Sequence, residues 1–197
     1  MTGNKDLKVI AFNGSPRPDG NTRMLVDTVL GELEAQGVST GVYQLGGNTI
    51  SGCRACYSCA KNRDGRCVID GDCINECISM MREADGMILA SPTYFADVTA
   101  EMKALIDRAG LVAKVNGDML ARKAGAAVVA VRRAGSIHVF DSINHFFLIN
   151  QMMVPGASYW NVGIGRDPGE AGSDGEGLET MRTLGRNMAW LMRKTRD

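Results

Sequence analysis

The sequence predicts an α/β protein in which a doubly wound, five-stranded parallel sheet lies between two layers of helices, as a three-layer α/β/α sandwich. Two observations support this prediction. Short apolar runs such as 7–12 and 126–131 show no alternation with polar residues, which is typical of strands buried on both faces. Segments with apolar residues at helical spacing separate these runs, and parallel strands require crossover connections of this length.

Length and composition narrow the class of protein. The 197 residues are enough for one domain with a sizeable core, so we assign 1–197 to a single domain. The chain has 22 basic and 22 acidic side chains and no basic block, which argues against a nucleic-acid partner. The first residues lack an apolar signal core, and no run approaches the ~18 apolar residues of a membrane span. We expect a cytoplasmic protein with no membrane contact.

The first strand, 7–12, is followed by a loop and by a helix that Asn21 can cap. Apolar residues then recur at helical spacing, and Gly37 ends the helix. The segment 38–45 is more amphipathic than the first strand, which favours a second strand nearer the edge of the sheet. Strand, helix and strand in this order open a parallel α/β sheet.

The regular order breaks at about 46–77, where glycines, cysteines and polar residues predict an insertion on the surface. Helix returns at 73–84. A third buried strand, 87–90, leads into the loop 91–95, and the next helix follows at 98–113.

The last part of the chain completes the sheet. The predicted elements are a fourth strand at 126–131, a loop at 132–136, a helix at 137–151, a fifth strand at 152–159, a long glycine-rich loop at 163–177 and a final helix at 178–194. In such sheets, ligands bind at the carboxyl ends of the strands, where the winding reverses direction. The loops after the first, third and fourth strands are therefore the candidate site.

The loop after the first strand suits a phosphate monoester. A helix start offers free amides and the positive end of the helix dipole, while hydroxyl and guanidinium groups add donors and charge. The residues concerned are Ser15, Arg17, Gly20, Asn21 and Thr22. The Walker pattern is absent because Asn21 follows the glycine where that pattern needs lysine, and the dinucleotide pattern Gly-x-Gly-x-x-Gly is absent here too. Taken alone, the loop is equally consistent with an ordinary turn and helix cap.

The loops after the third and fourth strands add further groups at the same edge. Pro92, Thr93, Tyr94 and Phe95 offer rigid backbone, a hydroxyl and two aromatic rings, which suit a flat heteroaromatic ligand. The segment 132–135, Arg-Arg-Ala-Gly, offers cations and free amides. Taken singly, the aromatic pair also suits core packing, and the arginines also suit a solvated turn.

Three motifs occur together in one order. They are Gly14-Ser15-Pro16-Arg17-x-x-Gly20-Asn21-Thr22, then Ser91-Pro92-Thr93-Tyr94-Phe95 with Lys103-x-x-x-Asp107-Arg108, and Arg132-Arg133-x-Gly135. Together they resemble the NADPH-dependent FMN reductase and iron-sulfur flavoprotein branch of the flavodoxin-like superfamily, over about 7–195. The resemblance implies a flavodoxin-like fold with FMN as cofactor. It also implies that Ser15, Arg17, Asn21 and Thr22 hold the FMN phosphate, that Pro92, Thr93, Tyr94 and Phe95 line the ribityl chain and the isoalloxazine, and that Arg132 and Gly135 approach the polar edge of the ring.

All six cysteines lie between Cys53 and Cys77, which indicates metal or redox chemistry rather than a disulfide framework. The pattern Cys53-x2-Cys56-x2-Cys59-x7-Cys67 has the tight spacing that iron-sulfur clusters use. It resembles the compact motif of iron-sulfur flavoproteins, which implies a [4Fe-4S] cluster on these four residues. Zinc also accepts four thiolates, and free thiols in a surface loop are a further alternative. Cys73 and Cys77 are additional, so other ligand sets are open.

The resemblance implies an FMN-dependent oxidoreductase that takes hydride from NAD(P)H, which binds transiently, and passes electrons to a small-molecule or protein acceptor, with a [4Fe-4S] cluster as a possible relay. The flavin performs the chemistry while the protein supplies position, a stacking face and charge, so no catalytic side chain is predicted. The alternatives are a metal-free quinone or azo reductase, a flavodoxin-like electron-transfer carrier, and a non-enzymatic zinc-binding module. Because the family is commonly dimeric or tetrameric, we expect a homodimer or homotetramer.

Overall fold

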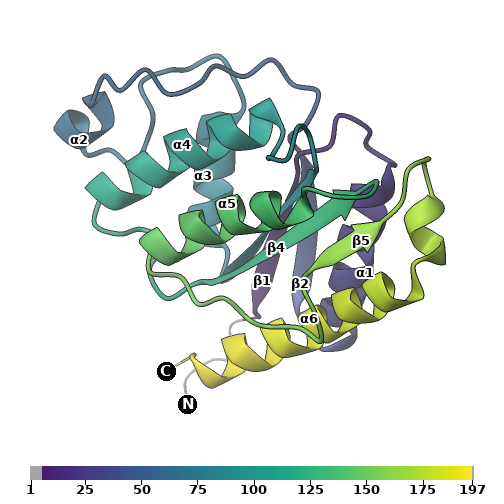
Figure 1. Cartoon of the computed structure of the whole chain (residues 1–197). Coiled ribbons are helices and arrows are strands. Elements are labelled where there is room, and N and C mark those ends of the chain that lie inside the picture. Colours follow the sequence, from purple (N-terminus) through teal and green to yellow (C-terminus); the bar gives the residue numbers. More distant parts are fainter. Residues whose placement is uncertain (1–5, 197) are drawn as a thin grey trace.

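The computed structural model describes residues 6–196 and contains one sheet of five parallel strands (Figure 1). The strands are β1 (Lys8–Asn13), β2 (Ser39–Gln44), β3 (Gly86–Pro92), β4 (Ala124–Val131) and β5 (Val162–Ile164). Their order in the sheet is β2-β1-β3-β4-β5, and every pair is parallel. This order is the flavodoxin-like one, with its reversal of winding between β1 and β3. The predicted doubly wound, five-stranded parallel sheet is therefore confirmed.

Helices cover both faces of the sheet, as the three-layer prediction requires (Figure 1). On one face lie α3 (Ile74–Glu83), α4 (Ala100–Val115) and α5 (Ser136–Ile149), and on the other lie α1 (Asn21–Ala35) and α6 (Gly175–Lys194). Two short helices, α2 (Ser58–Asn62) and the 3-10 helix η1 (Glu170–Ser173), lie in connections. No helix in the described part of the chain combines the length and apolar character that a membrane span requires.

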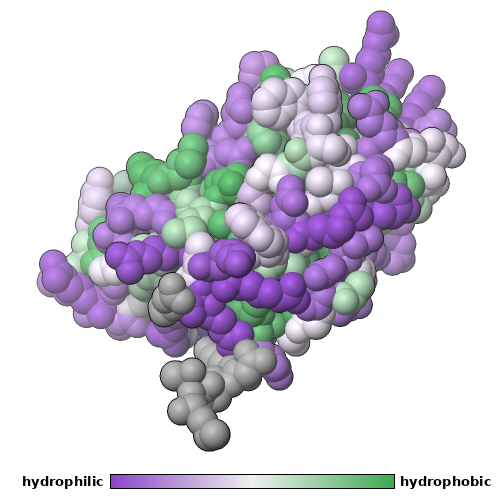
Figure 2. Space-filling view, turned by 90° about the horizontal axis from the view of Figure 1, so that it is seen from below, coloured by the Kyte–Doolittle hydropathy of each residue, from purple (hydrophilic) through white to green (hydrophobic). Residues whose placement is uncertain are grey.

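The inner strands β1, β3 and β4 are buried on both sides because their side chains alternate between two apolar cores. In β1, Ile10 and Phe12 pack in the core with α3, α4 and α5, whereas Val9 and Ala11 pack in the core with α1 and α6. This arrangement explains why the inner strands appear in the sequence as mostly apolar runs without alternation. Polar side chains cover most of the face seen in Figure 2, and hydrophobic ones form smaller areas between them.

The position predicted for the fifth strand was wrong. Within 152–159, the backbone forms one isolated bridge, between Met153 and Ala124, and then leaves the sheet. Pro155 has no N–H to donate to a ladder, and a glycine follows it, so pairing cannot continue. The chain rejoins the sheet at β5, which pairs with 129–131 of β4. From Val154 onward, the segment that suggested a strand instead lines a groove beside α5.

The loop predicted at 163–177 was also wrong in part, because it contains the end of β5, all of η1 and the start of α6. The predicted insertion at 46–77 lies over α4 on the face opposite α1 and α6 (Figure 1). It contains α2 and the start of α3. The predicted edge position of the second strand is confirmed, because β2 pairs only with β1.

Candidate functional site

A cleft of about 160 Å³ opens at the carboxyl ends of β1, β3 and β4. We call it the strand-end cleft. All three loops predicted to form the site contribute to it. From the predicted residues, its lining includes Ser15, Arg17, Asn21, Thr22, Pro92, Thr93, Tyr94 and Arg132. The structure therefore brings together eight of the ten residues proposed to bind the cofactor.

The start of α1 presents unpaired backbone amides to this cleft. Gly20, rather than Asn21, occupies the N-cap position, and no side chain caps the helix. The first amides of a helix have no partner within it, and they lie at the positive end of its dipole. Ser15 and Thr22 are almost fully buried, and Arg17 is exposed. These groups can hold a dianionic phosphate. The described residues that line the cleft include no Asp or Glu that would repel it.

Neighbouring residues fix the backbone of this first loop. The Asn13 side chain accepts a hydrogen bond from the Ser15 amide (3.1 Å) and donates one to Gln44 (2.8 Å). The Gln44 amide in turn donates to the Ser15 carbonyl (2.7 Å). The Thr99 hydroxyl, just before α4, donates to the Gly14 carbonyl (2.9 Å). The loop is thus held in shape before any ligand binds.

Asn21 lines the cleft, but its side chain is already engaged elsewhere. Its amide nitrogen donates to the Asp167 carbonyl (2.9 Å), and its oxygen accepts from the Ala171 amide (3.2 Å). Asn21 therefore ties the start of α1 to the segment around η1. Its backbone amide, rather than its side chain, is the group available to a phosphate.

The second loop forms a tight reverse turn. Tyr94 and Asp97 exchange backbone hydrogen bonds of 2.9 and 3.0 Å, and the two residues between them, Phe95 and Ala96, have positive φ angles of 47° and 62°. The Phe95 side chain is fully exposed and does not line the strand-end cleft. Tyr94 lines the cleft and is about half exposed, so it offers a ring face at the rim.

The third loop brings Arg132 to the cleft, while Gly135 packs behind it. A side chain at Gly135 would lie 3.1 Å from Ala96, and the φ angle of 89° at Gly135 also favours glycine. Gly135 therefore allows the second and third loops to approach each other. Its predicted direct contact with the flavin stays a prediction, as does that of Phe95.

Sequence reasoning missed Gly165 and Arg166, which line the cleft from the segment after β5. A Cβ at Gly165 would lie 2.8 Å from the Asn21 side chain and 2.6 Å from the Ala171 amide, so only glycine fits. The glycines at 163 and 165 were the available signal.

The four cysteines predicted as metal ligands line one narrow recess between the insertion and α4. Cys53 and Cys56 are exposed, Cys67 is partly buried, and Cys59 is buried on α2. Hydrogen bonds from Ser58 lower the pKa of Cys56, whereas burial raises the pKa of Cys59. Cys73 and Cys77 lie outside this recess, Cys73 at the N-cap of α3 and Cys77 within that helix.

The donor chemistry of the recess fits an iron-sulfur cluster. Four thiols line it, and Leu111 and Val112 of α4 provide an apolar wall. Among the described residues, no three His, Cys, Asp or Glu side chains are close enough together to hold a single metal ion. The recess itself, about 10 Å³, would have to widen.

Comparison with known proteins agrees with these features. The family model of NADPH-dependent FMN reductases matches residues 7–167. The chain belongs to this family. It is therefore an FMN-dependent oxidoreductase of flavodoxin-like fold, and the strand-end cleft, with its free amides, hydroxyls and guanidinium groups, suits the phosphate end of FMN.

Two relatives of this FMN reductase-family protein are iron-sulfur flavoproteins. That of Methanocaldococcus jannaschii is 38% identical over 194 residues, covering 95% of this chain and 98% of the relative. That of Methanosarcina thermophila is 32% identical over 196 residues, covering 97% and 100%. Among solved structures, RosB with a bound flavin-derived intermediate has a TM-score of 0.74 at 19% identity, covering 96% of this chain and 80% of RosB. At that identity, RosB supports the fold alone.

Proposed function

We propose that this protein oxidises NADH or NADPH with FMN and delivers the electrons to an acceptor, and that Cys53, Cys56, Cys59 and Cys67 hold a [4Fe-4S] cluster as a second electron carrier. Bound FMN would accept hydride, and a cluster would exchange single electrons. The nicotinamide leaves oxidised, and the two electrons that it loses pass to the acceptor. The names of the iron-sulfur flavoprotein relatives support this proposal.

The observation that carries the proposal is the meeting of all four cysteines in one recess beside α4. This helix also borders the flavin site, because Thr99 at its N-cap contacts the phosphate loop. Arg108 of the same helix lines the cysteine recess. Arg108 follows Thr99 by nine positions, which corresponds to roughly 14 Å along the helix axis. One rigid helix thus connects the two cofactor sites.

The chain's own residues would bind and orient FMN. The amides at the start of α1, with the Ser15 and Thr22 hydroxyls and Arg17, would hold the phosphate. Pro92, Thr93 and Tyr94 would line the remainder of the cofactor, with Tyr94 as a ring at the rim. Arg132 would place positive charge near the pyrimidine edge, where reduced flavin becomes negative, and Arg166 offers a second cation on the same cleft.

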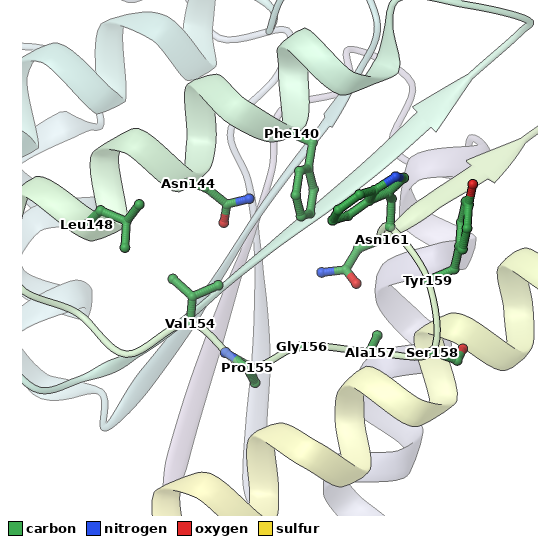
Figure 3. A pocket seen from close by; sticks show the side chains of 11 residues that line it. Phe140, Asn144, Leu148, Val154, Pro155, Gly156, Ala157, Ser158, Tyr159 and Asn161 are labelled. Carbon is green, nitrogen blue, oxygen red and sulfur yellow. The ribbon is translucent and has the colours of Figure 1, made fainter.

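An apolar groove beside α5 supports assembly with a second copy of the chain. Phe140, Asn144 and Leu148 of α5 face the segment 154–161 across this groove, whose volume is about 580 Å³ (Figure 3). With a formal net charge of zero, two copies also approach without strong repulsion.

The apolar surface continues past Tyr159 and Trp160, which also line a second hollow with Ile137 and Ile164. These four side chains are between 39% and 65% exposed. Contiguous exposed apolar surface of this kind marks protein interfaces. We therefore propose a homodimer or homotetramer that buries this surface.

Anaerobic purification tests both cofactors together. We expect flavin absorption after addition of FMN. After reconstitution with iron and sulfide, we expect about four iron and about four sulfide per chain, as the formula of a [4Fe-4S] cluster requires. NADH and NADPH oxidation, measured with a quinone and with a protein acceptor, would identify the donor and the acceptor class. Absence of flavin bands would contradict FMN binding.

A matched pair of variants tests the ligand set. Cys67→Ser removes a thiol of the recess, whereas Cys73→Ser removes a cysteine of the same insertion that lies outside it. We expect Cys67→Ser to lose iron and Cys73→Ser to keep it. Equal loss in both variants would contradict the proposed ligands. A wild-type protein that reduces quinone but binds no iron or sulfide would indicate the alternative function, a metal-free quinone reductase. The small volume of the recess, about 10 Å³, favours this alternative.

A further inference from the structure

Arg108 is the largest fully buried side chain in the part of the chain that the structure describes. A buried guanidinium is costly unless its charge is balanced and its donors are used. Asp72 balances the charge through an ion pair in which the two side chains are 0% and 8% exposed. Burial raises the pKa of Asp72, but hydrogen bonds from Arg108, Ile74 and Ser51 outweigh it and hold the pKa below its usual 3.8. Asp72 is therefore ionised at neutral pH.

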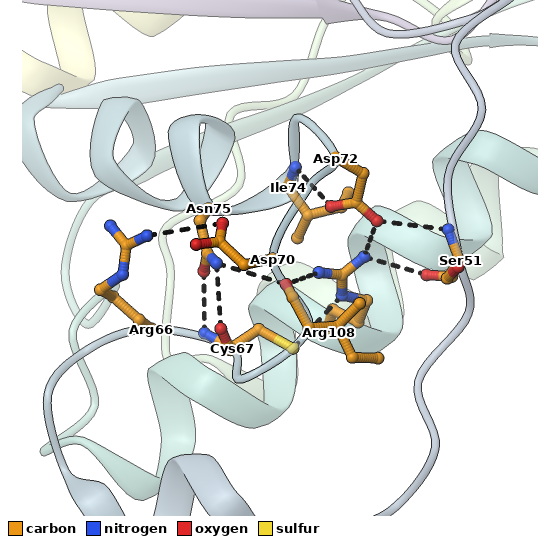
Figure 4. Close-up of polar contacts among 9 residues, drawn as sticks. Ser51, Arg66, Cys67, Asp70, Asp72, Ile74, Asn75 and Arg108 are labelled. Atoms are coloured by element: carbon orange, nitrogen blue, oxygen red, sulfur yellow. Dashed lines mark hydrogen bonds and ion pairs between the residues drawn. The ribbon is translucent and has the colours of Figure 1, made fainter.

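In the part of the chain that the structure describes, every hydrogen-bond partner of the Arg108 side chain belongs to the cysteine-rich insertion (Figure 4). One terminal nitrogen donates to Asp72 and to the Ser51 carbonyl (3.0 Å), and the other donates to the Ile69 carbonyl (2.7 Å). The Nε atom donates to the Cys67 sulfur at 3.4 Å. A residue of the core helix α4 thus fastens three separate points of the insertion and also contacts a proposed cluster ligand.

Cys67 is held from a second side by Asn75 of α3. The Asn75 side chain accepts from the Cys67 amide (2.8 Å) and donates to the Cys67 carbonyl (2.9 Å). Asn75 therefore fixes the Cys67 backbone, and Arg108 contacts its sulfur (Figure 4). By contrast, Cys53 and Cys56 are exposed, and two residues of their segment, Ala55 and Tyr57, have positive φ angles. Of these proposed ligands, Cys67 is thus held in a fixed position, whereas the exposed segment with Cys53 and Cys56 can move toward it when a cluster binds.

We propose that Arg108 is the positioning residue of the cluster site: it holds Cys67 in place and donates a charge-assisted hydrogen bond to its sulfur, which makes the reduction potential of the bound cluster more positive. The inference rests on the proposed function, because it requires a cluster on Cys67. Its physical basis is general, since hydrogen bonds to cluster sulfurs and nearby positive charge favour the reduced state, which carries more negative charge.

A merely structural role for Arg108 makes a different prediction from a positioning role. If Arg108 only fastens the insertion, its replacement lowers iron retention but leaves the potential of the remaining cluster unchanged. If it also acts on the Cys67 sulfur, both properties change. Asn75 provides the matched control, because its hydrogen bonds to Cys67 go to the backbone amide and carbonyl.

The experiment compares wild type, Arg108→Lys and Asn75→Ala after anaerobic reconstitution with iron and sulfide in the FMN-loaded protein. Iron loss to a chelator and the cluster's midpoint potential, followed by electron paramagnetic resonance, are the two readouts. We expect both variants to bind iron roughly 10- to 100-fold more weakly. Only Arg108→Lys should shift the midpoint potential to a more negative value. An unchanged potential in Arg108→Lys, or an equal shift in Asn75→Ala, overturns the inference while leaving the proposed function intact.

A third variant covers the case in which Arg108→Lys cannot retain a cluster. Asp72→Asn removes the carboxylate but leaves Arg108 able to donate to Cys67, so its potential should equal or exceed that of wild type. A more negative potential in Asp72→Asn also overturns the inference. If wild type itself takes up no iron or sulfide, the proposed cluster function fails instead, and the two failures are distinguishable.

Discussion

At the scale of single residues, the shape of the phosphate loop depends on close backbone contact. A Cβ at Gly46 would lie 2.3 Å from the carbonyl carbon of Ser15 and 2.5 Å from the carbonyl oxygen of Gly14, so the loop would have to shift. We expect Gly46→Ala to weaken FMN binding and to lower the free energy of unfolding by about 1 to 3 kcal/mol. Fluorescence titration with FMN and urea unfolding measure the two effects.

Gly31→Ala is the control for this prediction. Gly31 lies in α1, and an added Cβ there meets no atom within 4 Å. Alanine is the better helix former, so Gly31→Ala should leave FMN binding unchanged and raise stability by about 1 kcal/mol. If Gly46→Ala changes neither FMN affinity nor stability for the worse, as expected of Gly31→Ala, close backbone contact at Gly46 does not determine the shape of the phosphate loop.

The sequence alone predicted which residues of the phosphate loop suit a phosphate, but it did not predict their hydrogen-bond partners. Ser15, Arg17 and Thr22 suit a phosphate wherever the loop follows a parallel strand, and the cleft contains all three. The role of the Asn21 side chain depends on Asp167, which is 146 residues away in the chain. Only the tertiary structure shows that this side chain is engaged in fastening η1.

At the scale of elements, the start of α4 and the phosphate loop stabilise each other through Thr99. Its hydroxyl accepts from the Met102 amide at 3.4 Å as the helix cap and donates to the Gly14 carbonyl at 2.9 Å. Valine has the same shape without the hydroxyl. We expect Thr99→Val to lower the free energy of unfolding by about 2 kcal/mol, since two hydrogen bonds are lost at a buried position, and to weaken FMN binding.

Thr99→Ser separates the hydroxyl from the methyl group, because serine keeps the cap and the bond to Gly14. It should bind FMN nearly as wild type does and lose less stability in urea than Thr99→Val. The prediction fails if serine and valine variants weaken FMN binding to the same extent.

Burial on both faces made three strands easy to predict. β1, β3 and β4 lie inside the sheet and are buried over nearly their whole length, so apolar residues predominate in them without alternation. β5 has three residues, one of which is glycine, and it lies at the edge. The more apolar segment 152–159 gave a stronger strand signal, yet the structure uses it to line the α5 groove. A groove wall and a buried strand share the same composition, which is why sequence alone could not separate them.

At the scale of the whole molecule, the apolar surface around Trp160 gives the proposed oligomer a direct test. Phe140 and Trp160 pack with ring centroids 5.8 Å apart beside the groove, and Trp160 is still 54% exposed. A glutamate at this position would place a charge within the surface that a second copy would cover. We expect Trp160→Glu to sediment as a monomer and wild type as a dimer or tetramer, because burying an unpaired carboxylate opposes association.

The chain supplies its own control, since its only other tryptophan, Trp190, is similarly exposed at 60% but lies on α6, outside the α5 groove. Trp190→Glu introduces the same charge at a distance from the proposed interface and should sediment as wild type does. FMN titration of both variants confirms that the flavin site is intact, so that loss of association is not mistaken for loss of fold. A monomeric wild type, or dissociation by Trp190→Glu alone, would show that the α5 groove is not the surface that joins the copies.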